Sequence, residues 1–223
     1  MNVYFLVEGK RTEMRVYPKW LSSLAPRLNK VRFYHEVCTN QYVLFSGEGY
    51  PSLLNHLENA IEDVNVHGNF DYFVVCLDVE TRTPKELVSE INNYLQSKQI
   101  RLNPRTRFKI IFQNRCIETW FLGNRTFYKR SPQDSDLRGY IEHYDVHDHD
   151  PELMPKPSHF PLSIAEFHTS YFKKICGERN CTYTKTHPGI VTEETFLKAL
   201  VQRYQDTKHI ASFGDFAELC KRF

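Results

Sequence analysis

Acidic residues follow two apolar segments of this chain, and their types and spacing suit metal binding. Glu8 comes directly after the apolar run 3–7, and Glu13 lies shortly after it. Asp78 and Glu80 stand at the end of the run 72–77. Because alternate residues of an extended chain point to one side, we predict that Asp78 and Glu80 share a face. Carboxylates held this close repel one another unless a cation lies between them, and a divalent metal with oxygen ligands is the usual solution.

A third apolar segment, residues 108–112, is also followed by an acid, Glu118. We predict that Asn114 caps a short helix that carries Glu118 near its start and buries Trp120 and Phe121. Each acid also has a simpler explanation. Glu8 could be a solvated loop residue, and the helix dipole alone favours an acid such as Glu118 in a first turn.

The elements that must position these acids alternate between strands and helices. Short runs rich in β-branched and aromatic residues predict strands at residues 3–7, 41–45, 72–77 and 108–112, with a further extended segment at 31–37. Apolar residues at helical spacing predict helices at 13–21, 52–64, 84–95, 136–143, 162–175, 192–204 and 214–222. Thr12 is placed to cap the first of these helices, and Thr83-Pro84 opens the third, with proline in its first turn. This alternation predicts an α/β fold with a mostly parallel central sheet, whose strand ends are where ligands bind.

The second half of the chain has a different character. Residues 131–160 are rich in Pro, Asp and His and show little periodicity, so we expect a long loop with one short helix. We therefore predict a core at residues 1–125 and a loop and helical extension at residues 126–223 that packs on it.

Composition limits the function without choosing it. The formal net charge of +2 over 223 residues is low for a nonspecific DNA-binding protein, so binding to nucleic acid would need a local basic patch, bound metals or a partner. The six cysteines are scattered, which favours free thiols in a reducing compartment. No apolar stretch approaches the ~20 residues that cross a membrane, and Glu8 interrupts the only apolar run near the N-terminus, so we expect a cytoplasmic protein.

Three segments resemble the motifs of TOPRIM-domain nucleases of the RloB-like and OLD-nuclease-like group. They are Val-Glu-Gly-Lys-Arg-Thr-Glu at 7–13, Leu-Asp-Val-Glu at 77–80 and Asn-Arg-Cys-Ile-Glu-Thr-Trp-Phe-Leu at 114–122. The resemblance covers about the first 125 residues and implies a Rossmann-like TOPRIM core. It also implies a stand-alone TOPRIM protein of the anti-phage defence type, acting beside an ATPase partner. The family has aspartate where this chain has Glu80.

The resemblance implies roles for individual residues. Glu8 would be the catalytic acid or base, and a metal ligand together with Glu13, Asp78, Glu80 and Glu118. Two Mg²⁺ or Mn²⁺ ions would serve phosphodiester hydrolysis, because so many carboxylates exceed what one ion needs. Lys185, in the segment Tyr-Thr-Lys at 183–185, would stabilise charge on the phosphate. Lys10, Arg11 and Arg115 are the candidate nucleic-acid contacts, and each could equally be an ordinary surface cation.

Other functions stay open at this point. The same metal chemistry cuts transfer RNA or structured RNA as well as DNA, and a TOPRIM fold can also serve as a non-catalytic regulatory or binding subunit of an ATPase complex. A nuclease that cuts both strands can act as a homodimer, although no residue indicates one. Cys176, Cys181 and His187, with His168 as a fourth ligand, could bind zinc, but their spacing is not typical. The acidic and histidine-rich run 143–150 could be a solvated loop or a lid.

Overall fold

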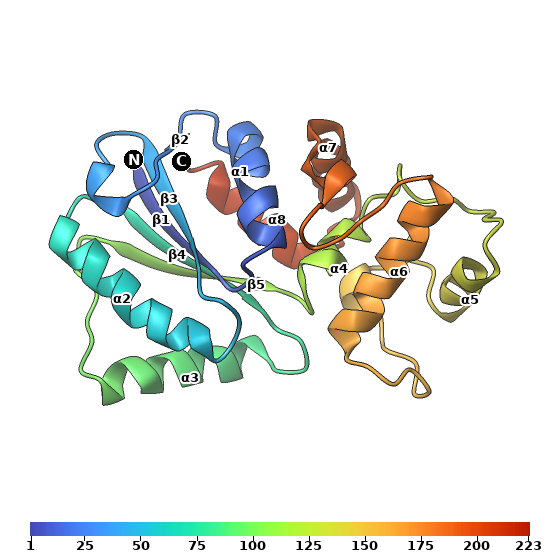
Figure 1. The fold of residues 1–223 in the computed structure, drawn as a ribbon, viewed down its shortest axis with the longest axis horizontal. Helices are drawn as coiled ribbons and strands as arrows, with labels where there is room; N and C mark the ends of the chain where they lie inside the picture. Colours follow the sequence, from blue (N-terminus) through green and yellow to red (C-terminus); the bar gives the residue numbers. More distant parts are fainter. The chain divides into compact units, whose positions relative to one another are not determined.

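The computed structural model describes all residues from 1 to 223 and contains a five-stranded parallel sheet (Figure 1). The strands are β1 (Asn2–Val7), β2 (Asn29–Lys30), β3 (Gln41–Ser46), β4 (Tyr72–Asp78) and β5 (Arg107–Gln113), in the order β2-β3-β1-β4-β5. Val7 pairs with Ser46 of β3 on one side and Cys76 of β4 on the other. The predicted α/β class with a parallel sheet is confirmed.

The contacts of the chain group its residues into two compact units. Unit 1 comprises residues 1–77, 82–112 and 219–223, and unit 2 comprises residues 78–81 and 113–218. The chain therefore passes between the units at the ends of β4 and β5 and near its C-terminus. The domain boundary expected near residue 125 stays a prediction.

In unit 1 the central strands β1 and β4 are covered on both faces, which explains why they are apolar over almost their whole length, whereas the edge strands β2 and β5 carry polar residues. Helices α2 (Ser52–His67) and α3 (Pro84–Ser97) pack on one face, where Tyr4, Phe73 and Val75 meet Leu57 and other side chains of a single apolar cluster (Figure 1). Helix α1 (Thr12–Leu24) and the C-terminal residues 219–223 belong to the opposite face. There the ring of Phe223 lies 5.1 Å from Tyr72 and 6.1 Å from Phe5.

Some helix ends and turns differ from the prediction. α3 opens at Pro84, as expected, and Thr83 caps it through a capping box with Glu86. Thr12, in contrast, is already the first residue of α1 and is not its cap. The segment 31–37 is not extended, because Glu36 accepts hydrogen bonds from the backbone N–H groups of Arg32 and Phe33 and closes a 3₁₀ turn.

Unit 2 is helical. Its helices are α4 (Ile117–Phe121), α5 (Ser135–His143), α6 (Ile164–Glu178), α7 (Glu194–Thr207) and most of α8 (Ala211–Cys220), with 3₁₀ turns at Pro151–Leu153 and Gly189–Thr192. They surround an aromatic core in which the ring of Phe172 lies 5.3 Å from Phe121 and 5.1 Å from Tyr183. All four helices predicted after residue 130 are present. Asn114 is not a cap, since Cys116 occupies that position of α4.

The cysteines are free, as predicted, and Cys76 and Cys116 are buried in the core. None of the helices is both long and apolar enough to cross a membrane.

Candidate functional site

Glu8 is held by its backbone in the loop that follows β1. Its N–H donates to the carbonyl oxygen of Cys76 at 3.0 Å, and its carbonyl oxygen accepts from the N–H of Gly49 at 2.8 Å. These bonds continue the sheet pairing by one residue, so the position of Glu8 is set by β4 and by the loop after β3. Its side chain is half-buried at the carboxyl end of β1.

Glu13 lies against Gly9, and this contact explains the glycine. The Glu13 side chain is only 4% exposed in the first turn of α1. A Cβ atom built on Gly9 would lie 2.0 Å from Oε2 of Glu13, so no larger residue fits without moving this carboxylate. Burial raises the pKa of the Cys76 thiol to about 12, and the nearby charge of Glu13 adds to the rise. Glu13 therefore lies on the sheet face that carries Cys76.

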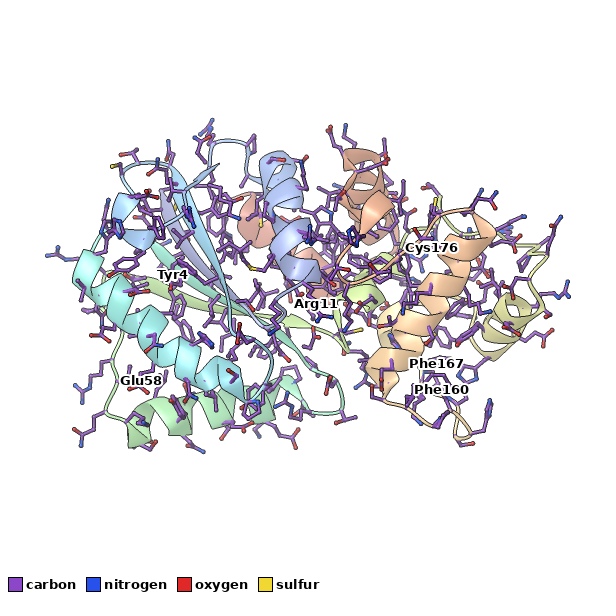
Figure 2. The ribbon with its side chains drawn as sticks, in the orientation of Figure 1. Tyr4, Arg11, Glu58, Phe160, Phe167 and Cys176 are labelled. Atoms are coloured by element: carbon purple, nitrogen blue, oxygen red, sulfur yellow. The ribbon has the colours of Figure 1, made fainter.

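The two predicted cationic contacts of unit 1 are exposed. Lys10 lies 3.9 Å from Glu48 in a solvent-exposed ion pair, which contributes little to stability. Arg11 occupies the N-cap position of α1 (Figure 2). Both side chains are accessible to a nucleic-acid backbone.

In unit 2, the strand-end acids Asp78 and Glu80 are arranged differently from the prediction. β4 ends at Asp78, and Glu80 has a φ of 49°, in the left-handed region. The alternation that would place both side chains on one face therefore stops before Glu80.

The Glu80 turn is joined to a second strained turn. The N–H of Glu80 donates to the carbonyl oxygen of Arg115, whose φ is 75°, and Nη1 of Arg115 donates back to the carbonyl oxygen of Glu80 at 2.8 Å. Non-glycine residues in this region store strain and are enriched at functional sites. Arg115 thus supports the turn that carries Glu80.

Asp78 and Glu118 lie close to the same buried thiol. Burial raises the pKa of Cys116 well above its ordinary value, and the charges of Glu118 and then Asp78 raise it further. Glu118 is 1% exposed and accepts a hydrogen bond of 2.7 Å from the hydroxyl group of Tyr183. A buried carboxylate held in this way has a fixed orientation, as a metal ligand or a positioned acid requires.

Glu80 and Lys185 line one polar cavity of unit 2 with a volume of about 550 Å³. Helix α6 provides the opposite wall through Ser163, Glu166, Thr169, Ser170 and Lys173. The positive charge of Lys185 contributes to lowering the pKa of Glu166, after the stronger effect of its hydrogen bonds with Ser163. The α6 residues were not predicted, although their spacing of three or four residues marks one helix face in the sequence.

The predicted site residues thus form two groups, each within its own unit. Unit 1 holds Glu8 and Glu13, and unit 2 holds Asp78, Glu80, Glu118 and Lys185. No three His, Cys, Asp or Glu side chains are placed together as a metal-ligand set. The donors nevertheless fit Mg²⁺ or Mn²⁺ in kind, since they are all carboxylates and Mg²⁺ usually takes only one or two of them and keeps several waters.

The alternative zinc ligands are not assembled in this way either. Cys176, Cys181 and His187 do not form a group that could hold a metal ion. His168 uses both ring nitrogens in hydrogen bonds, to the hydroxyl group of Thr119 at 2.8 Å and the carbonyl oxygen of Met154 at 3.2 Å. Burial lowers the pKa of His168 to about 4, so the ring is a neutral part of the core.

The histidine- and aspartate-rich run is fastened to the core by a buried arginine. The guanidinium group of Arg203, on α7, donates to the carbonyl oxygens of Val146, His147 and His149 at 2.8 to 3.1 Å. Arg203 is 2% exposed, so its guanidinium group lies in the core, where it binds the loop. The run is therefore an anchored segment of unit 2.

Comparison with known proteins adds no relative to this geometry. No protein-family model matches the chain, and searches of curated proteins and of solved structures returned no match.

Proposed function

We propose that the chain is a metal-dependent nuclease that hydrolyses phosphodiester bonds of DNA. The observation that carries the proposal lies within unit 2. Asp78 and Glu118 flank one buried thiol, while Glu80 and Lys185 line one polar cavity. Carboxylates for a hard cation and a lysine for a phosphate are the groups that this reaction needs.

The residues take the following roles in the proposal. In unit 2, Asp78, Glu80 and Glu118 would hold the metal. In unit 1, Glu13 would be a ligand, and Glu8 would be a ligand or accept the proton of the attacking water, as the resemblance implies. When bound, Mg²⁺ or Mn²⁺ supplies Lewis-acid chemistry that makes water nucleophilic at neutral pH. Lys185 neutralises charge on the phosphate, and Lys10 and Arg11 bind the polymer backbone. Arg115 contributes indirectly by supporting the Glu80 turn.

Two features support the use of Glu13 and Glu118. Both carboxylates are almost fully buried, and burying an ionised carboxylate costs free energy unless a partner compensates for it. Glu118 accepts a hydrogen bond from Tyr183. The carboxylate of Glu13 fills the space that a side chain at position 9 would need. A divalent cation is a partner that compensates for this cost.

Cleavage of supercoiled plasmid DNA and of total transfer RNA tests the proposal. Each polymer is incubated with the purified chain in Mg²⁺, in Mn²⁺ and in chelator, with and without the ATPase that the resemblance implies as a partner. Glu8→Gln and Asp78→Asn are each expected to lower the cleavage rate at least ~100-fold, the range for lost acid–base or metal groups. Glu62→Gln and Asp206→Asn, exposed acids of units 1 and 2, serve as matched controls.

The double variant Glu8→Gln/Asp78→Asn examines whether the two groups of acids serve one reaction. Residues that act as one catalytic unit are strongly non-additive, so the double variant should lose little more than either single variant. Full activity in both single variants would exclude the proposed site. Cleavage of RNA alone would change the substrate class, and metal binding without any cleavage would indicate the regulatory subunit.

A further inference from the structure

Unit 2 contains a second cavity, of about 480 Å³, whose walls are mainly aromatic. Tyr140, His143, His159, Phe160, Phe167 and Lys174 line it. Figure 2 shows Phe160 and Phe167 close together beside α6. The volume falls in the usual range for small-molecule pockets, about 300–1,000 Å³.

The rings are organised around Phe167. The ring centre of Tyr140 lies 5.1 Å away at an interplanar angle of 30°, and that of Phe160 lies 5.1 Å away at 73°. Phe167 itself is 3% exposed, whereas Tyr140 and Phe160 are half-buried and line the cavity. Rings held at fixed angles around an open space form a surface on which a planar group can stack.

Polar groups accompany the rings. Lys174 lies 2.5 Å from Oδ2 of Asp136, and both residues line the cavity with exposed side chains. The ring of His143 is oriented by the hydrogen bond from its Nε2–H to the carbonyl oxygen of Pro155, at 2.9 Å. A cavity with stacking rings and both donors and acceptors suits a nucleobase, which offers a flat face and a hydrogen-bonding edge.

Helix α6 contributes to both cavities of unit 2. Its residues Ser170 and Lys173 line the polar cavity of Glu80 and Lys185, while Phe167 and Lys174 line the aromatic one. The two cavities therefore lie on adjoining faces of one helix, which is about 10 Å across with its side chains. A nucleic-acid strand that crosses α6 can place a phosphate at the lysines of one cavity and a base in the other.

We infer that the aromatic cavity binds an unstacked base of single-stranded nucleic acid. The inference rests on the proposed function and deepens it, because it assigns substrate recognition to the face of α6 that adjoins the polar cavity. It also implies that the polymer is single-stranded or is opened where it is cut, since a base within a duplex cannot enter such a cavity.

Gly139 provides a clean way to block the cavity. It lies in α5, it lines the cavity, and a Cβ atom built on it meets nothing within 4 Å. Gly139→Leu therefore projects a side chain into open space and is compatible with the helix, because leucine favours helices more than glycine does. Gly177→Leu in α6 is the matched control, since Gly177 is equally open and lies outside the cavity.

The probe is a short single-stranded oligonucleotide with one 2-aminopurine, whose fluorescence falls when the base stacks on a ring. Binding is measured in chelator, so the result does not depend on catalysis. The unaltered chain and Gly177→Leu should quench the probe, whereas Gly139→Leu and Phe160→Ala should bind it at least ~10-fold more weakly. The same oligonucleotide with an abasic site in place of the 2-aminopurine should compete with the probe for the unaltered chain at least ~10-fold more weakly than an unlabelled oligonucleotide that keeps a base there.

Equal affinity of the unaltered chain and Gly139→Leu, or of the two oligonucleotides, would overturn the inference. Hydrolysis of bis(p-nitrophenyl) phosphate in Mn²⁺ separates this result from the nuclease proposal, because this ester has no base. Gly139→Leu should leave that hydrolysis unchanged. Quenching in a chain that hydrolyses no phosphodiester would support the base cavity and reject the nuclease.

Discussion

At the scale of single residues, the acids of this chain are distinguished by their surroundings. Glu13 and Glu118 are buried, whereas Glu80 is exposed on a turn with left-handed backbone. Each buried acid has a specific neighbour, Gly9 for Glu13 and Tyr183 for Glu118. These neighbours are as much a part of the candidate site as the acids, because they determine where the carboxylates lie.

Gly9→Ala is expected to displace the Glu13 carboxylate, since the new methyl group would occupy its place. The free energy of unfolding should fall by about 1–3 kcal/mol, the usual cost of overpacking. Mn²⁺ affinity, measured by calorimetry, should fall as far as it does in Glu13→Gln. Denaturant unfolding gives the stability change.

Two further variants separate this contact from a general effect of removing glycine. The double variant Gly9→Ala/Glu13→Ala should lose less free energy of unfolding than the two single variants together, because the shortened side chain at position 13 leaves room for the methyl group at position 9. Gly177→Ala, in open space on α6, should stabilise the chain by up to ~1 kcal/mol. Strictly additive costs in the double variant would rule out the proposed steric contact.

At the scale of elements, helix α6 organises unit 2. It begins at a capping box between Ser163 and Glu166, lines both cavities, and ends at Glu178. An acid at a helix C-terminus is disfavoured by the helix dipole, and three donors offset this. Glu178 accepts from Nζ of Lys129 and from the backbone N–H groups of Gln133 and Asp134. The end of α6 thereby fixes the segment that leads into α5.

The Glu178 contacts predict a defined dependence of stability on pH. Its bond with Lys129, together with the two backbone donors, lowers the pKa of Glu178 from about 4.5 to about 2. A carboxylate with a lowered pKa stabilises the fold above its unfolded pKa, and this contribution is lost as the pH falls through the folded pKa. Glu178→Gln should therefore lower the Tm at pH 7, and the difference from the unaltered chain should shrink between about pH 4.5 and 2.

Thermal unfolding followed by circular dichroism at several pH values measures this difference. Glu142→Gln, an exposed acid on α5, is the matched control and should follow the unaltered chain. A difference that persists unchanged down to pH 2 would show that Glu178 acts through packing and not through its charge.

At the scale of the whole molecule, the C-terminal residues pack against the N-terminal strand β1. Residues 219–223 belong to unit 1, although the residues immediately before them belong to unit 2. Phe223 packs on Phe5 and Tyr72, and burial raises the pKa of the neighbouring Cys220 thiol well above its ordinary value. The last residues therefore complete the core of unit 1, which holds Glu8 and Glu13.

Phe223→Ala tests this closure. Replacing a fully buried phenylalanine by alanine lowers the free energy of unfolding by about 3–5 kcal/mol. Because Phe223 is half-buried, we expect Phe223→Ala to lower it by about 1–2 kcal/mol. The thiols of Cys76 and Cys220, both fully buried, should react faster with Ellman's reagent in this variant. Arg222→Ala, exposed and next to it, is the control, and equal thiol reactivity in both variants would contradict the role of Phe223.

The sequence by itself determined the class of fold and most of its elements. Buried parallel strands are apolar along their whole length, and the apolar residues of surface helices recur with a period of 3.6 residues. Both patterns can therefore be recognised in a short stretch of sequence. The helices after residue 130 and the strands β1, β3, β4 and β5 were predicted for this reason. Helix starts were predicted less well, since Thr12 is the first residue of α1 and Cys116, not Asn114, occupies the N-cap position of α4.

Only the tertiary structure decided which residues lie together. The contact of Gly9 with Glu13 joins residues close in sequence, but Tyr183 reaches Glu118, and Lys173 meets Glu80 and Lys185 around one cavity, across long separations. The left-handed turn at Glu80 likewise depends on Arg115, far along the chain. The sequence named the acids, whereas their burial and partners follow from packing between distant segments, which local patterns do not encode.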